Sequence, residues 1–150
     1  MEEINSRDIA LQLLRENKII RTTARVYIIE TMLAKDVPME ANEIFEHILS
    51  KVGEESIWLS TVYRNLELFE QKGLVHQVRM PDSDSSFYHL HEQEHKHFAI
   101  CEICRKEIPL AFCYLDELAD SLEEQGFTPK YHRLDIFGLC KECLIREASK

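Results

Sequence analysis

The chain has 150 residues, of which 45% are hydrophobic and 30% are charged, and its formal net charge is −9. This length and balance are typical of one ordinary domain or of two small ones. The sequence has no apolar run near the roughly 20 residues that span a bilayer and no signal-peptide pattern at its N-terminus, so it predicts a cytoplasmic protein with no membrane partner. The acidic charge alone argues against nucleic-acid binding, because phosphate contacts need concentrated Lys and Arg.

The first half of the chain has the periodicity of amphipathic helices. One apolar face covers residues 9–14, and a second, preceded by Thr22 or Thr23 as N-cap, covers residues 26–33. The clearest pattern covers residues 41–52, where apolar side chains recur at i, i+3, i+4, i+7 and i+8. We therefore expect three helices before residue 53.

A fourth helix and a hairpin follow. The helix is predicted from Ser60, a good N-cap residue, to Gly73. The pattern then becomes alternating, and residues 74–78 and 87–90 are predicted as two strands joined by a turn-rich segment. Three helices, a fourth and a hairpin are typical of a winged helix-turn-helix, which we assign to residues 1–82.

Residues 83–150 read as a small second domain with alternating elements. A strand is predicted to end near Cys101, a helix to cover residues 115–126, and a further strand to cover residues 131–137. The whole chain is therefore predicted to be α+β, with an N-terminal winged helix and a C-terminal α/β domain.

Two Cys-x-x-Cys pairs predict a metal site in this second domain. They comprise Cys101, Cys104, Cys140 and Cys143. Four thiolates from two such pairs suit the tetrahedral, sulfur-rich coordination of Zn²⁺, and a closed site of this kind is structural. In a reducing compartment this spacing favours metal over disulfides, and the odd fifth residue, Cys113, fits no complete disulfide set.

A dense run of histidines precedes the first cysteine pair. Its members are His89, His91, His95 and His97. Alternate residues of a strand point the same way, so each closely spaced pair can converge on an ion. Imidazole suits Zn, Fe, Ni and Cu, with a carboxylate completing a mixed set of ligands. Four histidines within nine residues favour metal binding over surface decoration, whereas His76 and His132, taken singly, could simply cap a strand or bond the backbone.

The predicted fourth helix has a polar outward face. Its apolar stripe leaves Ser60, Thr61 and Arg64 on the opposite side, with Tyr63 flanking them. In helix-turn-helix proteins this part of the second helix reaches base edges and phosphates. Arg64 is the first candidate for a base or phosphate contact, and Tyr63 could contact a thymine methyl or a phosphate. On spacing alone, an ordinary solvated helix face fits equally well.

Three separated motifs resemble the ferric uptake regulator superfamily. The run Leu-Ser-Thr-Val-Tyr-Arg-Asn-Leu at residues 59–66, followed by Gly-Leu-Val at residues 73–75, resembles the recognition helix and first wing strand of that superfamily. Residues 21–25 resemble the segment that opens its second helix, and Arg21 joins the expected DNA contacts. The cysteine pairs fall where its structural zinc site does. The resemblance covers nearly the whole chain and implies a homodimeric, metal-responsive repressor that binds palindromic double-stranded operator DNA and no small organic substrate.

Within the superfamily, the wing and the following strands look most like the zinc uptake regulator branch. There a wing histidine, a Cys or His in the next strand, a histidine before the first cysteine pair and an acid after it hold a regulatory zinc ion. The matching positions are His76, His89, His95 and Glu107. A second site of the family combines histidines of the run with an acid of the following helix and a histidine of the last strand. The matching positions are His97, Asp116 and His132, with His95 or His91 completing the set.

Two departures bear on these expectations. Iron- and peroxide-sensing members commonly supply a histidine just before the third helix, where this chain has Val37, so the resemblance favours Zn²⁺ over Fe²⁺, Mn²⁺ or nickel. His97 stands one residue further from Cys101 than the corresponding histidine does in many relatives, which leaves open whether His95 and His97 serve one site or two. Cys113 is either an additional ligand or a small core residue.

Two rival functions belong to other classes. A zinc hydrolase would need an open metal position and a general base, which His95, His97 and Glu107 could supply, but no His-Glu-x-x-His motif supports it. A zinc-ribbon module that binds proteins would explain the acidic charge. The three family motifs favour a regulator that is not an enzyme.

Overall fold

The computed structural model describes residues 5–54, 57–91, 97–113, 115–130 and 132–150, except for the side chain of Asp116. The chain forms two compact units, Met1–His91 and Glu92–Lys150. The sequence placed the boundary at residue 82, in the turn of the hairpin. In the structure the second strand of that hairpin stays with the first unit, because it pairs with the first strand along its whole length.

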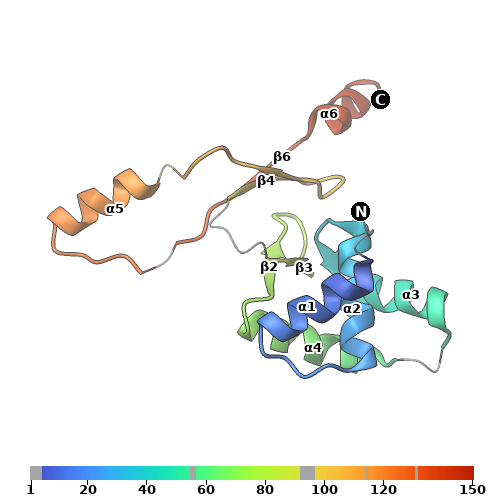
Figure 1. Cartoon of the computed structure of the whole chain (residues 1–150). Helices are drawn as coiled ribbons and strands as arrows, with labels where there is room; N and C mark the ends of the chain where they lie inside the picture. Colours follow the sequence, from blue (N-terminus) through green and yellow to red (C-terminus); the bar gives the residue numbers. More distant parts are fainter. Residues whose placement is uncertain (1–4, 55–56, 92–96, 114, 131) are drawn as a thin grey trace. The chain divides into compact units, whose positions relative to one another are not determined.

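The first unit is built on helices that pack around one core. They are α1 (Ser6–Glu16), α2 (Thr23–Lys35), α3 (Ala41–Val52) and α4 (Leu59–Gln71). Figure 1 shows them gathered together, and α2 contacts each of the other three. Thr22 caps α2 as predicted, since its hydroxyl accepts a hydrogen bond of 3.3 Å from the amide of Arg25.

The apolar stripes predicted from the sequence form this core. The largest fully buried side chains include Leu14, Ile29, Ile44, Leu66 and Phe69, one or more from every helix. Removing such a side chain from water contributes roughly 1.5–3 kcal/mol each. The four helices are therefore held mainly by packing.

The start of α4 differs from the prediction. Ser60 was expected to cap the helix, but Trp58 occupies the N-cap position and makes no side-chain cap bond. Ser60 instead lies in the first turn with its side chain exposed. The hydroxyl of Ser60 is thus displayed on the helix surface.

A small antiparallel sheet completes the first unit. Its strands are β1 (Met39–Glu40), β2 (Val75–Arg79) and β3 (Ser86–Leu90), in the order β1-β3-β2. The hairpin of β2 and β3 was predicted, and its register places His76 directly opposite His89. β1 was not predicted, because two residues are too short to show a period.

The second unit pairs strands from distant parts of its sequence. It contains β4 (Phe98–Cys101), β5 (Glu107–Pro109), α5 (Leu115–Glu124), β6 (Asp135–Gly138) and α6 (Lys141–Ala148). The sheet order is β5-β4-β6, with β5 antiparallel and β6 parallel to β4. Across the described residues, none of the helices combines the length and the apolar character that a membrane span requires.

Candidate metal centres and nucleic-acid interface

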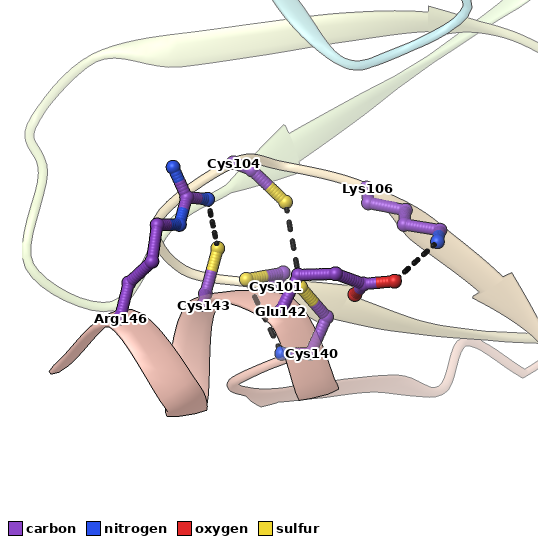
Figure 2. A network of polar contacts seen from close by, with 7 residues as sticks. All are labelled: Cys101, Cys104, Lys106, Cys140, Glu142, Cys143 and Arg146. Atoms are coloured by element: carbon purple, nitrogen blue, oxygen red, sulfur yellow. Dashed lines mark hydrogen bonds and ion pairs between the residues drawn. The ribbon is translucent and has the colours of Figure 1, made fainter. Parts of the chain in front are cut away.

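The four cysteines of the two pairs come together in the second unit (Figure 2). Their sulfur atoms all lie within 4.8 Å of one another, and the Sγ atoms of Cys104 and Cys140 are 3.8 Å apart. A zinc ion with Zn–S bonds of about 2.3 Å requires sulfur–sulfur edges of about 3.8 Å in a regular tetrahedron. The four thiols therefore fit a single tetrahedral ion.

Strand pairing explains how two short motifs, about 40 residues apart in sequence, meet at this point. Cys101 ends β4 and lies opposite Gly138 of the parallel strand β6, so the residues that follow both strands emerge side by side. The amide of Glu102 donates to the carbonyl of Gly138 at 2.9 Å and continues this contact beyond the strand. Cys140 is the N-cap residue of α6, which places Cys143 in the first turn of that helix.

Hydrogen-bond donors around the cluster favour the thiolate form of Cys101, whereas at Cys140 the pKa-lowering amide of Cys143 is outweighed by burial and by side-chain hydrogen bonds with Cys143 and Glu142, which raise the pKa of Cys140 to about 12. The amide of Cys140 donates to Cys101 Sγ at 3.4 Å, and the guanidinium of Arg146 donates to Cys143 Sγ at 2.9 Å (Figure 2). Burial raises the pKa of the Cys101 thiol, but the amides of Cys140, Cys104 and Ile103 outweigh it and lower this pKa to about 6. Because the thiolate is the form that binds metal, these donors prepare the site for an ion.

A second cluster of ligand atoms in the same unit joins His97, Cys113 and His132. The Nε2 atom of His97 lies 2.8 Å from Nε2 of His132 and 3.1 Å from Sγ of Cys113, and that sulfur lies 3.3 Å from Nε2 of His132. The three residues come from the segment before β4, the segment before α5 and the segment before β6. His97 and Cys113 are shielded from solvent, the first fully and the second in part.

This cluster contains part of the second site expected from the sequence. His97 and His132 lie together, and the structure adds Cys113, which the sequence left as either a ligand or a core residue; their use as metal ligands stays a prediction. The side chain of Asp116 lies outside the described residues, and His91 belongs to the first unit.

The wing of the first unit carries its own group of imidazoles. The ring centroids of His76 and His89 are 5.7 Å apart, and those of His76 and His91 are 5.8 Å apart. Asp36 Oδ1 lies 3.4 Å from Nε2 of His89. A carboxylate beside several imidazoles is a mixed oxygen and nitrogen ligand set of the kind that binds divalent transition metals.

Asp36 was not predicted as a site residue. This residue ends α2 in the left-handed conformation, with φ of 47°. Asp adopts this conformation more readily than most residues, and the position just after a helix often requires it. An acidic residue at the end of a predicted helix, one position before Val37, was the available signal.

Two members of the expected sensory set lie apart from the wing in sequence. Glu107 opens β5 and pairs with Ile100 of β4 in the second unit, and His95 lies outside the described residues. Within the first unit the structure brings His76 and His89 together. Their joint use with His95 and Glu107 stays a prediction.

The expected DNA-binding residues of α4 form one polar face. Ser60, Tyr63 and Arg64 are exposed and Thr61 is half-buried, while Arg21 is exposed on the segment that leads into α2. The guanidinium Nε of Arg64 lies 3.4 Å from the carbonyl oxygen of Ser60, its hydrogen-bond acceptor. This face is open to a ligand, and its side chains are the kinds that contact bases and phosphates.

A partly buried pair of hydrogen bonds links α4 to α2. Arg25 donates through Nε to Oδ1 of Asn65 at 2.9 Å, and Asn65 donates through Nδ2 to the carbonyl of Thr61 at 2.9 Å. Trp58, at the start of α4, is 72% exposed. Neither Asn65 nor Trp58 was predicted as a site residue, because a polar residue within a helix and an aromatic residue before a helix carry no specific signal.

A winged helix with an open polar helix face, joined in one chain to clusters of metal ligands, defines a metal-binding regulator of the DNA-binding class. Residues 16–137 match the Ferric uptake regulator family. The chain belongs to this family. Its members are dimeric, DNA-binding transcription regulators and not enzymes, so the match gives no support to the hydrolase alternative.

Individual relatives agree with the family match. The chain is 33% identical over 139 residues to the peroxide operon regulator of Bacillus subtilis, covering 92% of this chain and 93% of that protein. It is 31% identical over 132 residues to the peroxide-responsive repressor PerR of Staphylococcus saprophyticus, covering 87% and 86%. The ferric uptake regulator Fur of Helicobacter pylori shares the fold, with a TM-score of 0.67 and 20% identity over 96% of this chain and 97% of that one. The superfamily is confirmed, whereas the zinc uptake regulator branch stays a prediction.

Proposed function

We propose that this protein is a zinc-responsive homodimeric repressor that binds palindromic operator DNA through α4. The observation that carries the proposal is the position of His76 and His89. They face each other on β2 and β3, and β2 begins only four residues after the end of α4. An ion bound by these strands would therefore lie only a few residues along the chain from the helix that would read DNA.

The cysteine cluster is assigned to a structural Zn²⁺ ion. Its ligands are Cys101, Cys104, Cys140 and Cys143, and the fit of their spacing to a tetrahedron supports this. A closed four-thiolate site has no open position for exchange or chemistry. Its role is to clamp the end of β4 to the start of α6.

The regulatory ion is assigned to His76 and His89, with His95 and Glu107 as further ligands. Such an ion would take ligands from both units and stabilise one arrangement of them. Dimeric DNA readers need their two helices about one DNA turn apart, or a multiple of it. Metal binding would therefore select the DNA-competent arrangement, and the preference of the ion for that arrangement sets the size of the response.

Exposed apolar side chains of the second unit support the homodimer. Leu118, Ile136, Leu144 and Ile145 are each between 45% and 58% exposed. A unit this small gains stability when such side chains are covered, and a second copy of the same surface is the commonest cover in soluble oligomers. We assign these exposed side chains to the dimer contact.

The DNA contacts are assigned to Ser60, Thr61, Tyr63, Arg64 and Arg21. Residues 1–80 carry 10 Lys and Arg against 13 Asp and Glu, which is a net charge of −3, whereas residues 81–150 carry 8 against 14, a net charge of −6. The excess of acidic residues is thus larger in residues 81–150 than in residues 1–80, which contain the helix that would approach the DNA phosphates. Basic side chains of the first 80 residues can then contact DNA phosphates despite the negative net charge of the chain.

A second candidate is a peroxide-responsive regulator that uses Fe²⁺ or Mn²⁺. It is favoured by the 33% identity to the peroxide operon regulator of Bacillus subtilis. Val37 stands against it, since a valine side chain cannot bind a metal. Asp36 beside His89 partly offsets that objection, because it supplies a carboxylate one residue away.

The test is DNA affinity as a function of buffered free Zn²⁺, Fe²⁺ and Mn²⁺. Trp58 is the only tryptophan of the chain and caps α4, so its fluorescence reports docking of that helix on a palindromic duplex. We expect Zn²⁺ to activate binding at the lowest free concentration. Activation by Fe²⁺ or Mn²⁺ alone would favour the peroxide regulator. No metal-dependent binding to any duplex would favour the zinc-ribbon module that binds proteins.

A further inference from the structure

The arrangement of His97, Cys113 and His132 cannot be explained by hydrogen bonding alone. All three pairs of ligand atoms lie between 2.8 and 3.3 Å. An imidazole nitrogen carries either a proton or a lone pair, and never both. If one Nε2 donates to the other, its only proton is used and it has no lone pair for the thiol, so the three contacts cannot all be good hydrogen bonds.

A cation among the three atoms removes this conflict. Each atom then directs a lone pair at the ion, and the pairs no longer compete for protons. Typical Zn–N and Zn–S bonds of about 2.1 and 2.3 Å give edges of roughly 3.3–3.6 Å in a tetrahedron. The observed edges are shorter by roughly 0.3–0.6 Å, which side-chain rotations can supply.

We propose that Cys113 is a metal ligand and that His97, Cys113 and His132 form a thiolate-containing site separate from the four-cysteine cluster. The site deepens the proposed function, on which it rests, since it adds a sulfur ligand to the histidines expected at the second metal position. One thiolate with two imidazoles favours Zn²⁺ and other thiophilic ions over Mn²⁺ and Mg²⁺, which prefer oxygen. Three protein ligands leave a fourth position for a further side chain or water.

The experiment uses full-length protein that keeps zinc in the four-cysteine cluster and has lost its exchangeable metal to a mild chelator. Co²⁺ is then added, because a cobalt ion bound by a thiolate shows a sulfur-to-metal charge-transfer band that one bound by nitrogen and oxygen lacks. We expect the band in the parent protein, while the zinc content stays at one ion per chain.

Two substitutions separate a ligand from a packing residue. Cys113→Ser should remove the band and weaken cobalt binding on the order of tenfold or more, since even supporting residues around a metal site change affinity 10–100-fold. Cys113→Asp keeps an anionic ligand, so it should bind cobalt without the band. His132→Gln should also weaken cobalt binding and remove the band, because it takes away one of the three ligands. The matched control His47→Gln, on α3 and outside the cluster, should behave like the parent protein.

A band that is absent from the parent protein, or that persists in Cys113→Ser, would overturn the proposal. Alkylation of Cys113 provides a measurement on the unmutated chain: bound metal should slow it, and an unchanged rate would also count against the ligand role. Both readouts need no DNA. A protein that shows the Cys113 band but never binds a duplex would keep this inference and reject the proposed repressor, and the converse result would reject only the inference.

Discussion

The two ligand clusters of the second unit differ in how their residues are distributed along the chain. Each cysteine pair spans four residues, so half of the four-cysteine cluster is fixed by local geometry and one strand pairing, β4 with β6, brings the halves together. The other cluster draws single residues from positions 97, 113 and 132. A closed structural site can thus be recognised from short sequence motifs, whereas the ligands of a mixed site meet only when the whole unit folds.

The first prediction tests the structural side of this comparison and has the largest expected effect. Cys143→Ser should release the bound zinc and unfold the second unit, because structural zinc contributes roughly 10–16 kcal/mol in small zinc domains. Metal content and circular dichroism would measure both changes. Cys113→Ser is the matched control and should keep one zinc ion per chain. If the second unit of Cys143→Ser stayed folded without zinc, the cluster would not be structural.

The same contrast explains how much of the molecule could be predicted from sequence. α3 and the β2–β3 hairpin follow long periodic patterns, and the Cys-x-x-Cys pairs carry their own spacing, so these were found. β1 and β5 are two and three residues long and show no period. α6 was missed because its first turn coincides with the second cysteine pair. Asp36 and Cys113 gain their neighbours only through tertiary structure, and one acidic residue at a helix end or one unpaired cysteine is too weak a local signal to assign a site.

The second prediction concerns the wing and asks whether its histidines respond to metal. His89→Ala should abolish metal-dependent DNA binding while the dimer and the structural zinc persist. Coupling between two ligands is typically about 1–3 kcal/mol, so operator affinity at saturating zinc should fall roughly 5–150-fold, to the level of the metal-free protein. Fluorescence of Trp58 and sedimentation would follow DNA binding and dimerisation. An unchanged affinity at the same free zinc would remove His89 from the sensory set.

The third prediction separates DNA reading from metal binding. Arg64→Ala should weaken operator binding by about 1–3 kcal/mol, because Arg64 is exposed on the outer face of α4 and a bidentate base contact is worth about that much. Its metal content should match that of the parent protein. Arg15→Ala, an exposed arginine on α1, is the matched control and should leave the operator affinity unchanged. Full-strength binding by Arg64→Ala would show that α4 does not read DNA through this residue.

The fourth prediction has the smallest effect and distinguishes a phosphate contact from a base contact. Arg21 is exposed on the segment before α2 and is not part of α4, so we assign it to the DNA backbone. A phosphate contact carries no sequence information but releases a counterion on binding. Arg21→Ala should therefore weaken binding to operator and to unrelated duplexes by the same factor, and should reduce the slope of log K against log salt by about 1. Arg64→Ala should instead reduce the ratio between operator and unrelated DNA. If Arg21→Ala changed that ratio, Arg21 would contact bases, and the reading surface would extend from α4 to the start of α2.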